Sequence, residues 1–145
     1  MPEPEATYPA LEGTKWTLEA FEPKNEDAIE IDTTENMPYF LYFDSDSTFI
    51  SNWACNYGGG EYISETSGGI LEVIGVGGTR SKCGWTIAFL QALQTSYEYQ
   101  IEDSTLYILY SDVSYVYGGS LMYDRNKKGR LKFRAGINSV DSRYD

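Results

Sequence analysis

A chain of 145 residues, 41% of them hydrophobic, has the size of one globular domain and can bury a substantial core. Its 11 lysines and arginines against 22 aspartates and glutamates leave a net charge of −11 at pH 7, which disfavours binding to nucleic acid or to anionic lipid. The chain has no histidine, so Ser-His-Asp and Cys-His catalytic arrangements are excluded and the commonest metal ligand is missing.

The first residues do not resemble part of a core. Residues 1–10 are acidic and contain prolines, which predicts a disordered spacer. We therefore expect one domain over residues 11–136 and a C-terminal tail over residues 137–145. No run approaches the roughly 18 apolar residues of a membrane helix. We expect an export signal or a lipid anchor upstream of Met1, although a native cytoplasmic start fits the same residues.

Alternating apolar and polar residues predict strands in the first half of the chain. These strands are expected at residues 13–21, 38–43, 47–53, 61–64 and 69–76. The charged residues 22–36 show no period, and we expect a loop there. The polar stretch 44–48, "DSDST", predicts a hairpin turn, because Asp and Ser side chains can satisfy the backbone of a turn. It is a poor match to a calcium loop, since it lacks the glycine and the closing glutamate.

The period changes in residues 84–99. Ile87, Phe89, Leu90 and Leu93 cluster on one helical side, with Tyr97 one turn further on. This pattern predicts one amphipathic helix of about 10–12 residues, and we expect its apolar side to pack on the sheet rather than to bind a partner.

More strands are expected after the helix, at residues 97–102, 105–111, 120–125 and 129–135, and either of the last two could end the fold. With about seven or eight short strands and one helix, the predicted class is α+β, mostly β. We expect a curved antiparallel sheet or a partly open β-barrel with the helix packed against it.

The segment from residue 107 onward is rich in tyrosine. Tyrosine suits a half-buried pleated surface whose hydroxyl groups stay hydrated, and it also suits a binding surface. The candidate binding surface comprises Tyr107, Tyr110, Tyr115 and Tyr117.

Cys55 and Cys83 are the only cysteines of the chain. The pair could form a disulfide, worth roughly 3–4 kcal/mol, or remain as two buried thiols. Arg80 and Lys82 could activate Cys83, but without histidine no proton carrier is evident. Three glycines follow Cys55 in "WACNYGGGEY", and we expect them to form a bend or bulge between strands, since no lysine or helix follows as in a phosphate-binding loop.

Several spacings together resemble the META/HslJ family of small bacterial domains. The matching positions are Gly13, Trp16 and Leu18, then Cys55, Asn56, Gly60 and Tyr62, then Thr79, Arg80 and Cys83, and finally Phe89, Leu90 and Leu93. One departure is Ala54, where the family usually has glycine before its Cys-Asn pair. The resemblance covers residues 11–109.

The resemblance implies an envelope-associated domain of α+β or barrel-like form, often exported or lipid-anchored, with loose links to stress response and secretion. It implies no enzymatic activity and no cofactor. An oxidising compartment would favour the disulfide between Cys55 and Cys83, and the Asn56 amide would then satisfy local backbone groups.

We therefore expect a monomeric, non-enzymatic envelope domain that binds another envelope protein or maintains the envelope. The alternative is a carrier that holds a small apolar ligand or lipid in a barrel-like cavity. A glycosidase-like carboxylate pair would need a defined separation that a sequence does not reveal, and the cysteines lack the C-x-x-C spacing of a redox dithiol. No metal, cofactor or nucleic-acid site is expected.

Overall fold

The computed structural model describes residues 10–31, 39–44, 47–53, 56–65, 69–78, 86–113 and 127–135, without the side chains of residues 52, 53, 56, 57, 76–78, 86, 87 and 127. Within these ranges the strands are β1 (Lys15–Pro23), β2 (Ile29–Glu30), β3 (Phe40–Phe43), β4 (Thr48–Trp53), β5 (Asn56–Glu65), β6 (Ile70–Gly78), β7 (Ser96–Glu102), β8 (Thr105–Val113) and β9 (Lys127–Ala135), and the helix is α1 (Thr86–Gln94). The division into spacer, domain and tail stays a prediction, because residues 1–9 and 136–145 lie outside this part of the chain.

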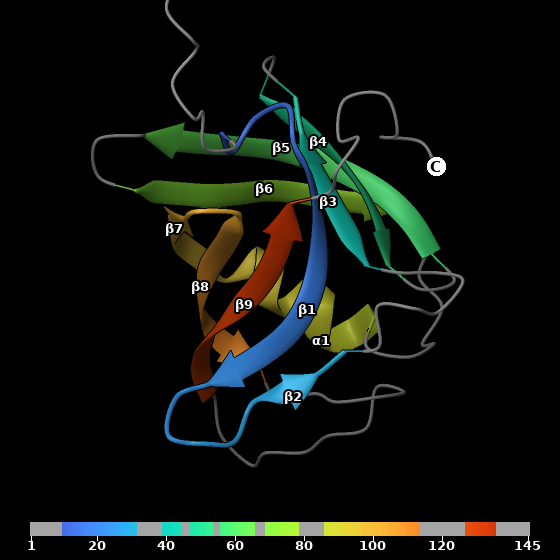
Figure 1. Ribbon diagram of the computed structural model, residues 1–145. Helices are drawn as coiled ribbons and strands as arrows, with labels where there is room; N and C mark the ends of the chain where they lie inside the picture. Colours follow the sequence, from blue (N-terminus) through green and yellow to red (C-terminus); the bar gives the residue numbers. More distant parts are fainter. Residues whose placement is uncertain are drawn as a thin grey trace, which may run out of the picture.

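The strands form one antiparallel sheet that closes on itself (Figure 1). From β3 to β9, each strand pairs with its sequence neighbour, while β1 pairs with both β3 and β9. The result is a closed eight-strand barrel with one extra strand, β2, and one short helix. This confirms the predicted mostly β class with one helix, and the sheet is a closed barrel rather than an open one.

The expected loop over residues 22–36 is wrong in part. Strand β1 continues to Pro23, and its second half pairs with β2. The first half of β1 pairs with β3 along the same edge. The Ile31 N–H donates to the Glu19 carbonyl at 2.8 Å, whereas the Leu18 N–H donates to the Tyr39 carbonyl at 2.9 Å. Charged side chains on the outer face of a strand leave its backbone hydrogen bonds intact. A charged stretch therefore does not by itself predict a loop.

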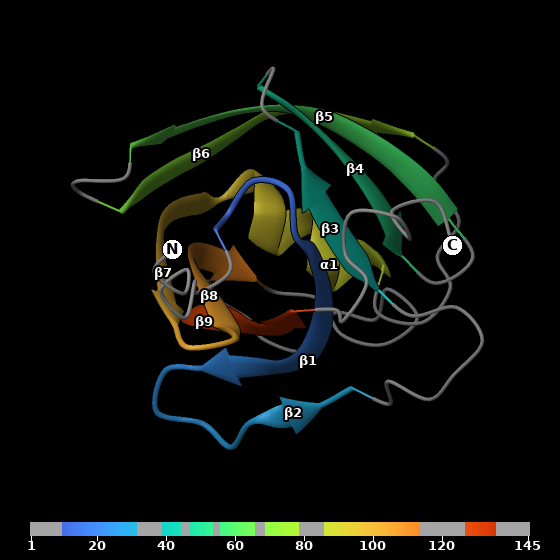
Figure 2. The same cartoon turned by 45° about the horizontal axis from the view of Figure 1, so that its top comes forward.

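The barrel seam between β6 and β7 is narrow. One residue pair joins these strands, Ile70 with Glu98, and beside it the Tyr99 N–H donates to the Gly69 carbonyl at 2.6 Å. Helix α1 contacts both β6 and β8, the strands on either side of β7. Figure 2 shows the ring of strands around α1, so the helix fills the region where the sheet is least continuous.

Helix α1 ends earlier than the sequence pattern predicts. It ends at Gln94, because two hydroxyl groups bind its last carbonyls: Thr95 Oγ1 donates to Gln91 at 2.9 Å and Ser96 Oγ donates to Leu93 at 2.8 Å. The chain then enters β7. The prediction of Tyr97 on the helical face is therefore wrong, since this side chain belongs to β7 and is 46% exposed.

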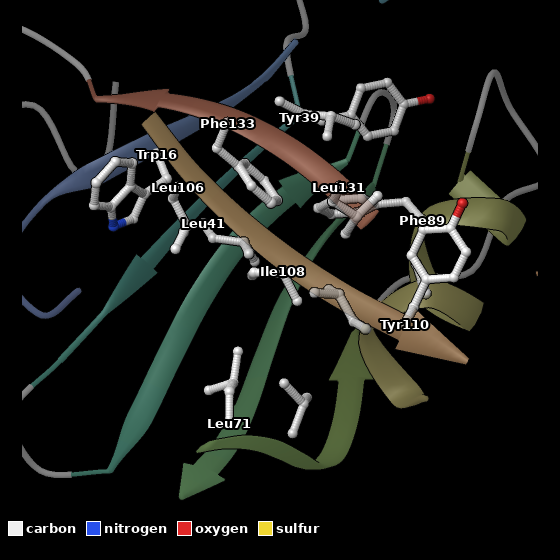
Figure 3. Close-up of a cluster of buried hydrophobic side chains, with 14 of the residues drawn as sticks. Trp16, Tyr39, Leu41, Leu71, Phe89, Leu106, Ile108, Tyr110, Leu131 and Phe133 are labelled. Carbon is white, nitrogen blue, oxygen red and sulfur yellow. The ribbon is translucent and has the colours of Figure 1, made fainter. Parts of the chain in front are cut away.

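The core lies inside the barrel and includes the apolar side of α1. Figure 3 shows its side chains converging from several strands and from the helix. The largest fully buried ones are Trp16, Leu18, Leu41, Phe43, Leu71, Phe89, Leu93, Leu106, Ile108, Tyr110 and Phe133. The ring of Phe89 packs against Tyr39, with centroids 5.4 Å apart, and against Phe133 at 6.2 Å. The expectation that the helix packs on the sheet is confirmed.

The glycine run lies inside β5, opposite a bulge in β6. Between the pairs Gly59–Gly77 and Glu61–Ile74, β5 contributes one residue and β6 contributes two, so the extra residue lies in β6 rather than in the glycine run. The register between β5 and β6 shifts between Gly59 and Glu61. A Cβ atom on Gly59 would overlap the Phe49 carbonyl oxygen of β4, and one on Gly60 would lie 2.7 Å from the Gly75 oxygen of β6. Close approach of neighbouring backbones therefore requires these glycines.

Candidate binding surfaces

The opening motif of the domain has a structural role. Gly13 has a φ of 84°, in the left-handed region, and its N–H donates to the Phe43 carbonyl at 3.0 Å. Trp16 is completely buried, and its indole Nε1 donates to the Leu11 carbonyl at 3.0 Å. Leu18 follows on the same inner side of β1. The Gly-x-x-Trp-x-Leu spacing thus fastens the start of the domain to the core.

Tyr62 joins three segments that are distant in sequence. Its ring is buried and packs edge-on against Phe43 at 4.8 Å, while its hydroxyl lies 2.5 Å from both the Glu12 Oε2 and the Asp44 carbonyl oxygen. Glu12 precedes β1 and Asp44 follows β3, where its N–H completes the expected hairpin turn by donating to Thr48 at 2.8 Å. The Gly-x-Tyr spacing therefore places a structural tyrosine.

Replacement of Tyr62 by phenylalanine is expected to lower the free energy of unfolding by about 1–2 kcal/mol, because the Asp44 carbonyl and the Glu12 carboxylate lose the partly buried O–H donor that they share. Urea unfolding followed by circular dichroism measures this change. Tyr107→Phe is the matched control, since the Tyr107 hydroxyl makes no hydrogen bond to the described residues, and it should change stability by less than about 0.5 kcal/mol. Equal effects of the two variants would contradict this role for Tyr62.

Other motif positions cannot be placed. Cys55, Thr79, Arg80, Cys83, Tyr115 and Tyr117 lie outside the described residues, as does the side chain of Asn56. The disulfide between Cys55 and Cys83 and the role of the Asn56 amide therefore remain predictions. So does the strand at residues 120–125.

The two described members of the tyrosine set lie on opposite faces of β8. Tyr110 is buried inside the barrel, next to Leu106 and Ile108 along the strand (Figure 3). Tyr107 faces outward and lies under Arg130, whose guanidinium carbon is 3.9 Å from the ring centroid. Tyr110 is therefore a core residue. Of these two tyrosines, only Tyr107 can belong to a binding surface on the outside of β8.

An exposed apolar surface lies on the outside of the β5–β6 hairpin, and the sequence pattern alone did not single it out. Ile63 of β5 and Ile70 and Ile74 of β6 are 51%, 43% and 39% exposed. Each isoleucine pairs across the strands with a glutamate, in the pairs Ile63 with Glu72, Ile70 with Glu65, and Ile74 with Glu61. We call these six residues the isoleucine–glutamate surface.

The signal for this surface is present in the sequence of β6. Its "ILEVI" has apolar residues in both alternating registers, since Leu71 and Val73 point into the barrel while Ile70 and Ile74 point outward. Such a strand is normally covered on both faces. On β6 the outward Ile70 and Ile74 are exposed, so these two apolar side chains do not contribute to the core.

The outer face of β9 has the opposite charge. Lys128, Arg130, Lys132 and Arg134 alternate with inward residues along this strand. Two of the four are paired with β1: Arg130 Nε donates to Glu22 at 2.6 Å, and Arg134 Nε donates to Glu19 at 2.6 Å. Among the described residues, the outer faces of the β5–β6 hairpin and of β9 thus carry charges of opposite sign.

The described residues line at least two pockets. The smaller, of about 500 Å³, is lined by Glu22, Pro23, Lys24, Tyr97, Leu109, Lys128, Gly129 and Arg130. The larger, of about 990 Å³, lies at one end of the barrel beside the seam and is lined by Ala10, Leu11, Glu12, Ser64, Gly69, Tyr99, Gln100, Ile101, Glu102 and Asp103. Ser64, Tyr99 and Ile101 share the inner face of the sheet with their buried partners Leu71, Ile108 and Leu106. The smaller pocket is on the outer face of the sheet, whereas the larger one opens at the end of the barrel, above the buried core.

In the described part of the chain, no group of three or more aspartate, glutamate or cysteine side chains is placed to hold a metal ion. No described helix is long and apolar enough to cross a membrane.

The fold defines the class of protein: a small antiparallel barrel whose core includes a single helix. A family model, described as the META domain, matches residues 9–118. The chain therefore belongs to the META-domain family, as its motif spacing suggested.

Two solved structures resemble this fold. One is an NMR structure of a protein from Burkholderia xenovorans, with 19% identity and a TM-score of 0.59, over 95% of this chain and 98% of the other. The second is a crystal structure of a DUF4847 family protein from Bacteroides vulgatus, with 12% identity and a TM-score of 0.52, over 86% and 93% of the two chains. Identities this low show the fold alone. No curated protein matches the sequence.

Proposed function

We propose that this domain is a monomeric, non-enzymatic interaction domain of the cell envelope, which docks another protein onto the isoleucine–glutamate surface. The observation that carries the proposal is the exposure of Ile63, Ile70 and Ile74 on neighbouring strands. Adjacent exposed apolar side chains surrounded by polar ones are typical of protein–protein contact sites. The envelope location rests on the family resemblance and on the expected upstream signal.

The charges around the isoleucines indicate what the partner offers. Glu61, Glu65 and Glu72 are all exposed, and each lies directly opposite an isoleucine. A complementary surface would place apolar side chains on the isoleucines and lysine or arginine side chains beside the glutamates. Such a complex would associate faster at low salt and weaken as salt screens the charges.

The hairpin also suits docking because its other face is anchored. Tyr62, Leu71 and Val73 point into the barrel and are buried there. The outer side chains are therefore held on a rigid sheet, and binding orders few additional groups. A preorganised surface of this kind loses little entropy on association.

Site-specific photo-crosslinking tests the proposal. The full chain would carry benzoylphenylalanine at Ile63, Ile70 or Ile74, and irradiation in cells is expected to give one discrete adduct from these positions. Gln100 is the matched control position, because it is exposed on the outer face of the neighbouring region of the barrel but lies outside the isoleucine–glutamate surface. Mass spectrometry of the adduct identifies the partner.

The purified partner then allows a quantitative test. Ile63→Asp and Ile74→Asp are each expected to weaken its binding by about tenfold or more, as for residues at the centre of an interface, whereas Gln100→Asp should leave affinity unchanged. Circular dichroism would verify that each variant is folded. Identical adducts from Gln100 and from the isoleucine positions, or no adduct from any of the three isoleucines, would overturn the proposed surface.

A further inference from the structure

The smaller pocket combines an apolar lining with positive charge. It lies where the end of β1 meets the start of β9, next to outward residues of β7 and β8. Leu109 and the ring of Tyr97 give it apolar area, and Lys24, Lys128 and Arg130 contribute three positive charges against the single negative charge of Glu22. A local charge of this sign is unusual on a chain whose net charge is −11.

The two lysines are held side by side by the backbone. Pro23 pairs with Gly129 at the end of the β1–β9 ladder, and the Lys24 N–H donates to the Lys128 carbonyl at 2.8 Å. Within the described ranges, neither ammonium group has an acidic partner at ion-pair distance. Like charges on neighbouring positions of paired strands repel each other, and an anion between them would remove this repulsion.

Arg130, the third cation of the pocket, already has partners within the domain. Arg130 donates to Glu22 at 2.6 Å and stacks on Tyr107, so its guanidinium is fixed in place. The negative charge of Glu22 is thereby neutralised by Arg130, and Lys24 and Lys128 remain available for a ligand. Two lysines suit one carboxylate or one phosphate group, because each ammonium has three donors and no fixed geometry.

We propose that this pocket binds a small amphiphilic anion. Its carboxylate or phosphate group lies between Lys24 and Lys128, and its apolar chain lies on Leu109 and Tyr97. The volume of about 500 Å³ is within the range of small-molecule sites. The pocket is separate from the isoleucine–glutamate surface, so this inference does not depend on the proposed partner. It also differs from the carrier hypothesis, in which the ligand lies inside the barrel.

Amide chemical shifts of the ¹⁵N-labelled full chain test the inference. Titration with decanoate and with decyl phosphate, each kept below its micelle concentration, is expected to give saturable shifts at Lys24, Tyr97, Leu109, Lys128 and Gly129. The tighter of the two probes identifies the preferred head group. Decyltrimethylammonium tests the need for negative charge, and butyrate tests the need for the apolar chain.

Single substitutions provide the matched controls. Lys24→Gln and Lys128→Gln are each expected to weaken decanoate binding about three- to fivefold, the usual loss for one exposed charge pair. Lys132→Gln removes the same charge from the same outer face of β9 but does not line the pocket, and it should change affinity less than about twofold.

The inference is overturned if neither anionic probe gives saturable shifts at the pocket, or if decyltrimethylammonium gives the same shifts. It is equally overturned if Lys132→Gln weakens binding as much as the two pocket variants. Because all three lysines are on the outer surface, none of these variants is expected to unfold the domain.

Discussion

Replacement of Phe89 by alanine is expected to lower the free energy of unfolding by about 3–5 kcal/mol. The ring is completely buried, and its loss removes the contacts with Tyr39 and Phe133 and leaves a cavity between the helix and the barrel. A domain is typically stable by only about 5–15 kcal/mol, so this one change removes a large share of the total. Urea unfolding measured by tryptophan fluorescence gives the value.

The matched control retains a large side chain at the same position. Phe89→Leu keeps most of the buried volume and should cost about 1–2 kcal/mol, as other size-conserving core changes do. Hydrogen exchange would show which region is loosened: in Phe89→Ala, protection is expected to fall first in α1 and at the β6–β7 seam. A loss of less than about 1 kcal/mol for Phe89→Ala would show that the helix does not hold the barrel together.

Gly59→Ala is expected to destabilise the domain by about 3 kcal/mol, although alanine is normally a better residue than glycine in a folded chain. The added Cβ atom would overlap the Phe49 carbonyl oxygen and press against the Ile50 backbone. Neither is the end of a flexible side chain, so β4 and β5 must move apart and their ladder hydrogen bonds weaken. Thermal unfolding should show a Tm lower by about 10 °C.

Gly75→Asn controls for the removal of a glycine near the same bulge. Gly75 has a φ of 64°, which asparagine tolerates, and no atom lies within 4 Å of its added Cβ position. This variant should lose only about 1 kcal/mol, the lower end of the cost of the left-handed conformation. If Gly59→Ala were as mild as Gly75→Asn, the close approach of β4 and β5 would not be the reason for the glycine run.

Much of the fold was predictable because local patterns and tertiary contacts agree. Strands such as β1 and β8 alternate buried and outward residues, so their period indicates both the strand and its inner face. The close backbone approach at Gly59 was predictable for a similar reason, since consecutive glycines inside a strand usually accompany such an approach. The alternation of the strands and the run of glycines can each be recognised within a short stretch of the sequence.

The predictions that failed depend on distant partners. The apolar period of the helix continues to Tyr97, but the hydroxyl groups of Thr95 and Ser96 end it earlier, and β7 finds its partner β8 in the following hairpin. Strand β2 consists of two residues and exists because the second half of β1 offers it an edge. Neither outcome can be inferred from a period alone.

The candidate surfaces show the same contrast between what a local pattern predicts and what tertiary contacts decide. Residue types along the chain were sufficient to exclude histidine chemistry, to indicate the META family and to predict a mostly β domain, because these conclusions need only composition, spacing and period. The closed barrel decided which residues meet. It buried Tyr110, left Ile63, Ile70 and Ile74 outside on adjoining strands, and brought Lys24 beside Lys128, although they are 104 positions apart in sequence. Surfaces of this kind arise from strand pairing between distant residues, and pairing is set by the whole sheet rather than by any single segment.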